Sequence, residues 1–278
     1  MNSPDASVRL PTYFISHGGG PWPWLTDQMP GDWGPLTRSL EDIPRHLGTP
    51  PRAILMVSAH WETPEFTVQT HPNPPMLYDY GGFPEFTYQV QYPAPGAPDV
   101  AERVAELLGG AGFPVQRDGT RGFDHGVFAP LVVAYPDADV PVVQLSIKHS
   151  FDPAEHLAAG RAIAPLRDEG VLIVGSGFTY HNLRNFGPGA AVPSREFDAW
   201  LSAAMAAPSS ERSRLLTEWE AAPSARAAHP REDHLIPLMV AVGAAEQEPA
   251  DRYYHETTFM NHITSSSFRI GAAPASEQ

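Results

Sequence analysis

The stretch TYFISHGGG, residues 12–20, joins a short apolar run to a histidine and three glycines. A continuous apolar run of this length is typical of a strand that is covered on both faces of a sheet. Four further runs have the same character, and proline or glycine bounds most of them. We therefore predict strands at residues 12–16, 53–58, 66–70, 141–147 and 171–175.

Amphipathic patterns lie between and after these runs. In residues 99–108, Val100, Val104 and Leu108 recur on one face of a helix that Gly109 would end. Similar patterns predict helices at residues 153–167 (with Asp152 as the N-cap), 196–206, 212–222 and 233–245.

Strands that alternate with helices are typical of α/β architecture. We predict a single domain, residues 11–270, with a central sheet that is mostly parallel or mixed and is flanked by helices. Residues 1–10 and 271–278 are expected to be flexible termini. The proline-rich segment 72–98 carries many aromatic side chains, so we interpret it as an ordered loop packed over a cleft.

The composition excludes several classes of protein. The net charge is −14, which disfavours binding to nucleic acids and to anionic membranes. The apolar runs are strand-sized, and the first residues lack an apolar signal region. We therefore expect a soluble, cytoplasmic protein.

Histidine is the residue type in this sequence that points most clearly to metal binding. The chain has 12 His and no Cys, so imidazole and carboxylate groups are its available ligands. His17 directly follows one predicted strand, His60 follows a second by two residues, and His181 lies beyond a third. Ligands bind at the carboxyl ends of strands in open α/β sheets, so three histidines at this edge suit a mononuclear metal.

Two more histidines lie at positions where they could belong to the same site. His125 lies in a loop with glycine on both sides, and His234 opens the last predicted helix. The alternative is ordinary packing, because a lone histidine is more often a hydrogen-bonded core residue, and no His-Glu-x-x-His motif is present. Ser176 lies between two glycines but lacks the full nucleophile-elbow pattern, which disfavours a serine hydrolase.

Seven short motifs, in this order along the chain, resemble the DOPA-dioxygenase type of the class III extradiol ring-cleavage dioxygenases, in the LigB-like superfamily. The resemblance runs from about residue 11 to residue 270. The motifs are ISHGGGP (15–21), VSAHW (57–61), DYGGFP (79–84), YPAPG (92–96), GFDHG (122–126), YPDADVPVVQLS (135–146) and SGFTYHNL (176–183).

The resemblance implies a role for each of the five histidines. His17 and His60 match two metal ligands, and His234 matches a third ligand that is often Glu in related enzymes. His181 matches a residue at the metal centre, either a further ligand or an acid/base group. His125 matches an acid/base residue beside the substrate and O₂. Carboxylates flank His234, at Glu232 and Asp233.

The resemblance also implies a non-haem Fe(II) enzyme that cleaves a catechol-type aromatic ring with O₂ to give a ring-opened semialdehyde, as in aromatic compound catabolism. An all-histidine site would also suit Zn²⁺. The alternatives are a zinc-dependent hydrolase that uses a metal-bound water, or a non-catalytic metal-binding protein. The expected partners are the aromatic substrate and O₂, in a monomer or small homo-oligomer. Arg121 and Arg184, beside motif residues, are candidates for binding a substrate carboxylate.

Overall fold

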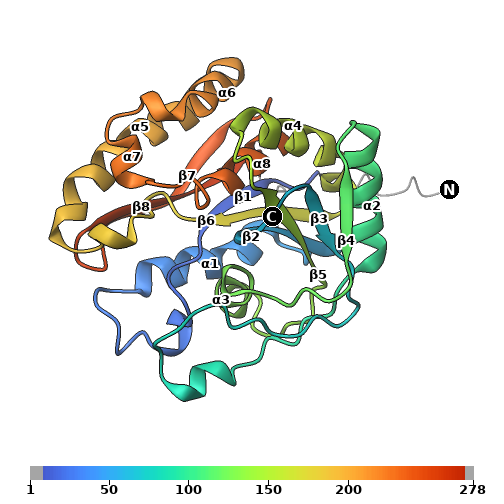
Figure 1. Ribbon diagram of the computed structural model, residues 1–278, viewed down its shortest axis with the longest axis horizontal. Coiled ribbons are helices and arrows are strands. Elements are labelled where there is room, and N and C mark those ends of the chain that lie inside the picture. Colours follow the sequence, from blue (N-terminus) through green and yellow to red (C-terminus); the bar gives the residue numbers. More distant parts are fainter. Residues whose placement is uncertain (1–8, 273–278) are drawn as a thin grey trace.

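The computed structural model describes residues 9–272; the expected flexible residues 1–8 and 273–278 lie outside this range. Within it, the strands form one eight-stranded sheet in the order β4-β3-β5-β2-β6-β1-β8-β7 (Figure 1). The strands are β1 (Thr12–Ser16), β2 (Ala53–Thr63), β3 (Phe66–Gln69), β4 (Val115–Asp118), β5 (Val142–Lys148), β6 (Val171–Gly177), β7 (Ala250–Phe259) and β8 (Ile263–Ile270).

The centre of the sheet is parallel and its flanks are antiparallel. β5, β2, β6 and β1 run in one direction, whereas β3 is antiparallel to β5 and β8 is antiparallel to β1. The predicted mixed sheet is therefore confirmed. Because β1, β6 and β2 are neighbours with the same direction, their carboxyl ends meet at one edge; Ser16 pairs with Gly177 and Ser58 with Ser176.

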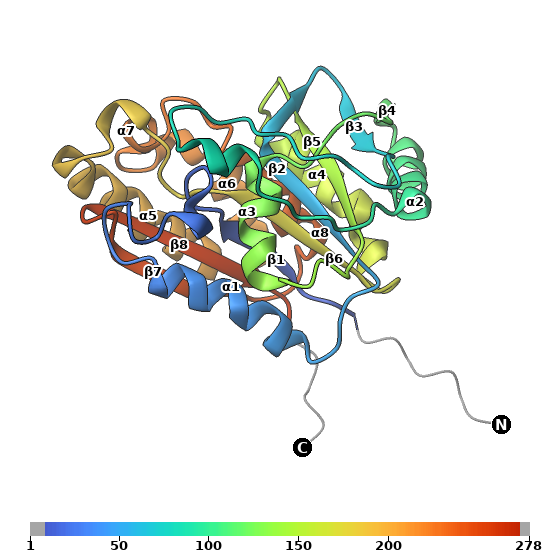
Figure 2. The ribbon, with the colours of Figure 1, turned by 90° about the horizontal axis from the view of Figure 1, so that it is seen from below.

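Helices cover both faces of the sheet. α1 and α3 pack together on one face, and Figure 2 shows them in front of the strands. α8 packs on β6 and β1 from the other face, and α4 covers α8. The helices are α1 (Gly34–Leu47), α2 (Pro98–Gly110), α3 (His125–Ala134), α4 (Pro153–Ile163), α5 (Ala191–Ala206), α6 (Ser209–Thr217), α7 (Ala225–Ala228) and α8 (Ile236–Ala244).

Short 3₁₀ turns connect several of these elements: η1 (Trp22–Trp24), η2 (Glu85–Tyr88), η3 (Ala164–Arg167), η4 (Leu183–Asn185), η5 (Pro188–Ala190) and η6 (Trp219–Ala221). Asp152 caps α4 as predicted, since its side chain accepts hydrogen bonds from the backbone of Ala154 and Glu155. No helix among residues 9–272 is long and apolar enough to cross a membrane.

Three details near the histidines differ from the sequence-based expectations. His60 lies inside β2, which continues to Thr63, instead of following the strand. His125 is the first residue of α3 and is not in a loop. His234 precedes α8, which begins at Ile236, in a turn closed by hydrogen bonds from Leu235 and Ile236 to the carbonyl of Glu232.

Candidate metal centre

A pocket of about 620 Å³ opens at the carboxyl edge of the parallel strands. All five singled-out histidines line it, together with charged residues and an apolar wall. The charged residues are Glu62, Asp79, Arg231 and Asp233, and the apolar wall consists of Met29, Phe83, Phe178, Leu183, Phe186 and Met260.

Three of the histidines converge through the same ring nitrogen. Nε2 of His60 lies 3.2 Å from Nε2 of His17 and 3.3 Å from Nε2 of His234. Their donor atoms form one group that could hold a metal ion. Three of the four positions predicted as metal ligands thus come together, from the end of β1, from β2 and from the turn before α8, whereas His181 lies outside this group.

Two of these imidazoles have a hydrogen-bond partner at the opposite nitrogen. Nδ1 of His17 lies 3.0 Å from Ser176 Oγ, and Nδ1 of His234 lies 2.8 Å from Asp233 Oδ2. The hydroxyl of Ser176 donates to the carbonyl of Gly126, so its oxygen accepts from His17 Nδ1. A carboxylate likewise only accepts, so Asp233 takes the proton of His234 Nδ1. Both histidines therefore present the lone pair of Nε2 to the group.

The electrostatics agree with neutral ligands. Burial, followed by the charges of neighbouring histidines, lowers the pKa of His17, His60 and His234 well below the ordinary value. Neutral imidazoles bind metals, and three lone pairs that face one another repel unless a cation lies between them. The donor set therefore fits a divalent metal ion.

Glycines allow His234 to lie close against β6. The position of a Cβ on Gly177 would be 2.1 Å from the carbonyl oxygen of His234, and one on Gly175 would be 2.3 Å from that of Pro237. The backbone of Phe178 donates to the same His234 carbonyl at 3.0 Å. On one face of residues 175–177, Ser176 therefore contacts His17. On the other face, the two glycines leave room for the turn that contains His234.

His125 and His181 lie beside the group of three. Nδ1 of His125 lies 2.8 Å from Asp79 Oδ1, and its ring centroid lies 4.0 Å from that of His60. The ring of His181 stacks on that of His234, with centroids 3.3 Å apart. Burial and the charge of His125 lower the pKa of His181 to about 4. His181 belongs to a second possible donor group, with Asp233 and His234.

A buried carboxylate that the sequence had not singled out supports His60. Asp124 accepts from Ser58 Oγ at 2.7 Å and from Arg121 at 2.8 Å, while Arg121 also donates to the carbonyl of His60. Burial, and then the charge of Asp79, raises the pKa of Asp124. Arg121 is thus engaged in holding the end of β2, and it does not line the pocket.

Arg231 is the cation at the pocket wall among the described residues. It forms an ion pair with Glu62, its guanidinium lies 4.6 Å from the ring centroid of Phe151, and its side chain is 56% exposed. The predicted candidates for a substrate carboxylate, Arg121 and Arg184, are both absent from the lining. Sequence reasoning missed Arg231, although it lies only three residues before His234.

The segment 72–98 contributes less to the pocket wall than its aromatic content suggests. It supplies Asp79 and Phe83, whereas Tyr78, Tyr80 and Tyr88 pack against one another. Their hydroxyls brace the segment, as that of Tyr78 donates to the carbonyl of Val90. The segment is ordered, as predicted, but it lines the cleft through Asp79 and Phe83 instead of covering it with its tyrosines.

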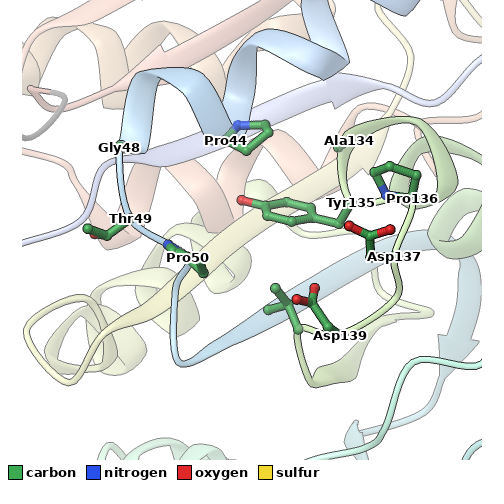
Figure 3. Close-up of a pocket in the computed structure, with 10 residues that line it drawn as sticks. Pro44, Gly48, Thr49, Pro50, Ala134, Tyr135, Pro136, Asp137 and Asp139 are labelled. Carbon is green, nitrogen blue, oxygen red and sulfur yellow. The ribbon is translucent and has the colours of Figure 1, made fainter.

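A second hollow, of about 320 Å³, lies at the amino ends of β2 and β5, away from the histidines. Figure 3 shows the ring of Tyr135 between Pro44 and Pro50, with Asp137 and Asp139 exposed nearby. Its lining contains no histidine. The hollow at the carboxyl edge is therefore the candidate functional site.

The fold and the histidine group define an α/β protein with a metal-binding pocket. Residues 11–270 match the family described as the catalytic LigB subunit of aromatic ring-opening dioxygenase. The chain is 40% identical over 252 residues to a 4,5-DOPA dioxygenase extradiol of Beta vulgaris, covering 88% of this chain and 91% of the relative. It is 38% identical over 250 residues to the protein of the same name in Escherichia coli K12, covering 88% and 89%.

A crystal structure of an uncharacterized protein from Escherichia coli K12 has a similar fold, with a TM-score of 0.76 and 34% identity. The similarity covers 95% of this chain and 100% of that one. The chain therefore belongs to the LigB family of aromatic ring-opening dioxygenases. It is an extradiol dioxygenase, an enzyme that acts on a small aromatic molecule with O₂.

Proposed function

We propose that His17, His60 and His234 hold one Fe(II) ion and that the enzyme opens the ring of a catechol-type substrate to a semialdehyde. The observation that carries this proposal is the convergence of three Nε2 atoms at the wall of the pocket. Bound Fe(II) supplies a Lewis acid that lowers the pKa of a catechol hydroxyl, and a redox centre for O₂.

The other two histidines are assigned to proton transfer. Ring opening requires that one proton leave the second hydroxyl of the catechol and that another reach the oxygen added to the ring. His125 donates from Nδ1 to Asp79, so its Nε2 is the atom that accepts or returns a proton at the substrate. His181 lies on the other side of the group, over the ring of His234, and takes the second of these roles.

The walls of the pocket orient the substrate. Phe83, Phe178 and Phe186 give the lining apolar surface that suits an aromatic ring. Glu62 and Arg231 form a charged side, where Arg231 can bind a carboxylate on the substituent of the ring. The relatives' names specify DOPA, a catechol with such a substituent, and we propose a substrate of this kind.

Metal loading under anaerobic conditions tests the proposal. Protein stripped with a chelator and reloaded with Fe(II) should consume O₂ and form a yellow product when a panel of catechols and air are added. Replacing His17, His60 or His234 by Ala should abolish both metal retention and O₂ uptake.

Zinc-loaded protein serves as the control, and it should bind the same catechols without consuming O₂. Absence of O₂ uptake across the panel with protein shown by metal analysis to contain Fe(II) would refute the proposal. Product formation by zinc-loaded protein without O₂ would instead favour the hydrolase alternative.

A further inference from the structure

Asp79 belongs to a segment far from His125 in the sequence, and backbone hydrogen bonds hold that segment against the centre. The backbone of Leu77 donates to the carbonyl of Phe123, and the backbone of Phe123 donates to that of Pro75, both at 2.8 Å. Gly122 permits this approach, because the position of a Cβ there would be 2.6 Å from the Pro75 carbonyl oxygen. The segment is thus bonded to the residues just before α3, which delivers Asp79 to the first turn of that helix.

The carboxylate of Asp79 contacts two histidines with its two oxygens. Oδ1 accepts from the backbone N–H of His125 at 3.0 Å and from Nδ1 of the same residue at 2.8 Å. Oδ2 lies 3.5 Å from Nδ1 of His60. The side chain of Asp79 is only 18% exposed, so water competes weakly for these contacts.

A group that only accepts hydrogen bonds constrains both rings. Nδ1 of His125 donates to Oδ1 and therefore carries the proton. Oδ2 is close enough to Nδ1 of His60 to favour a proton on that nitrogen as well. In both neutral imidazoles the lone pair then lies on Nε2. For His60 this nitrogen faces His17 and His234, and for His125 it is the nitrogen left for the substrate. His17 and His234 depend on separate partners, Ser176 and Asp233.

We propose that Asp79 is a positioning residue that sets the tautomers of His60 and His125 together, so that one carboxylate couples a metal ligand to the proton-transfer histidine. This inference rests on the proposed function for the roles of the two histidines. It adds Asp79, a carboxylate of the pocket lining, as a residue that acts through the two histidines.

The substitution Asp79→Asn separates this role from simple packing. Asn has the same size, but one of its two polar atoms donates. If its oxygen faces His125, its NH₂ group faces His60 Nδ1 and favours the wrong tautomer there. If the amide is reversed, the wrong tautomer arises at His125, and the backbone N–H of that residue loses its acceptor. Asp79→Glu keeps an acceptor at both positions and is the conservative variant.

The tautomers can be read by ¹⁵N NMR of histidine-labelled, Zn(II)-loaded protein near pH 7.5, with the signals of His125 and His60 assigned from His125→Gln and His60→Gln. The wild type and Asp79→Glu should show protonated Nδ1 at both residues, with a bare Nε2 at His125 and a zinc-bound Nε2 at His60. Asp79→Asn should either move the proton of His125 to Nε2 or abolish the zinc-bound signal of His60. Near-UV circular dichroism verifies that each variant is folded.

Metal affinity and kinetics provide the functional readouts. Asp79→Asn should bind Co(II) about 10-fold more weakly or, at saturating Fe(II), lower kcat about 100-fold with little change in KM. Asp79→Glu should recover most of the loss. Glu85→Gln, which removes the same charge from an exposed position of the same segment, should behave as the wild type.

Unchanged ring-nitrogen shifts in folded Asp79→Asn would overturn the inference, as would a shifted tautomer accompanied by wild-type metal affinity and kcat. Failure of the proposed function is distinguishable from both. In that case the wild type itself consumes no O₂ with any catechol, while the NMR spectra still decide whether Asp79 sets the tautomers.

Discussion

Four of the five histidines at the candidate centre have a neighbour at Nδ1 that favours a free Nε2. Ser176 serves His17, Asp233 serves His234, and Asp79 reaches His60 and His125. Partners of this kind orient metal-binding imidazoles and raise their basicity. The chemistry of the site therefore depends on Ser176, Asp233 and Asp79 as well as on the histidines, although none of the three belongs to a known metal-binding sequence motif.

Ser176→Ala should weaken metal binding about 10-fold or more. The hydroxyl of Ser176 accepts from His17 and donates to the carbonyl of Gly126, so its loss frees the ring of His17 and leaves a buried carbonyl unpaired. Competition of Co(II) with a chromophoric chelator measures the change. Ser39→Ala removes another buried hydroxyl, in α1, and should leave metal affinity unchanged. Equal affinity in wild type and Ser176→Ala would contradict this role.

Arg231→Gln should raise KM for a catechol that carries a carboxylate, by about tenfold, because a charge-assisted hydrogen bond is lost. Arg231 is the cation at the pocket wall among the described residues. Unsubstituted catechol should show no change, and steady-state O₂ uptake with the two substrates measures the difference. An equal effect on both substrates would show that Arg231 acts through Glu62 or through packing on Phe151.

The sequence predicted the histidines better than their partners. His17, His60 and His181 were recognisable because strand ends in an α/β sheet converge on one edge. Asp79 opens the DYGGFP motif but follows no strand, and its place beside His125 depends on how the segment before Phe123 folds back. Ser176 was considered only as a nucleophile, and its position under His17 follows from strand pairing that no local pattern reveals.

At the scale of elements, the end of β6 positions two of the proposed metal ligands: Ser176 contacts His17, and Gly177 lies against the backbone of His234. Gly177→Ala should reduce metal affinity at least tenfold and also destabilise the fold, because the new methyl group would lie 2.1 Å from the His234 carbonyl and must push that residue away. Co(II) titration and thermal unfolding measure the two effects.

Gly109→Ala is the matched control for that substitution. Gly109 lies in α2, and a Cβ there would meet nothing within 4 Å. Alanine has the higher helix propensity, so this variant should be as stable as the wild type or slightly more stable, with the same metal affinity. A Gly177→Ala variant that behaved like Gly109→Ala would contradict the close approach of His234 to β6.

Strands with continuous apolar runs and helices with apolar residues on one face were predictable from the sequence, and the other elements were not. β1 has the predicted bounds, Thr12–Ser16. β8 was missed because its buried residues include Thr264 and Ser265–Ser267, which pack by hydrogen bonding; Ser267 accepts from the backbone of Ser16. α3 was missed because it is apolar on all sides and contains Pro130.

Acid should destabilise the whole molecule in part through His156. This buried side chain accepts from the backbone of Lys148 at Nε2 and donates from Nδ1 to the carbonyl of Asp152. Burial lowers its pKa to about 4. The unfolded chain, with a histidine pKa of about 6.5, therefore binds more protons than the folded chain between these values. The stabilisation by neutral His156 is complete above pH 6.5 and is lost as the pH falls toward 4.

Urea unfolding of the wild type and His156→Gln at several pH values tests this prediction. From pH 7 to pH 5 the free energy of unfolding should fall by about 2 kcal/mol more in the wild type than in the variant. The comparison isolates His156 because the other buried histidines are present in both proteins. Parallel losses of stability would contradict the assignment.

The most direct test of ring opening at this centre is a single turnover of the Fe(II)-loaded enzyme with a catechol under ¹⁸O₂. The ring-opened product should be reduced immediately with borohydride, so that its aldehyde oxygen does not exchange with water. Mass spectrometry then measures the mass of the reduced product. Incorporation of both atoms of O₂ into one product molecule is the predicted result. A product without ¹⁸O, or one that takes its new oxygen from labelled water, would contradict it.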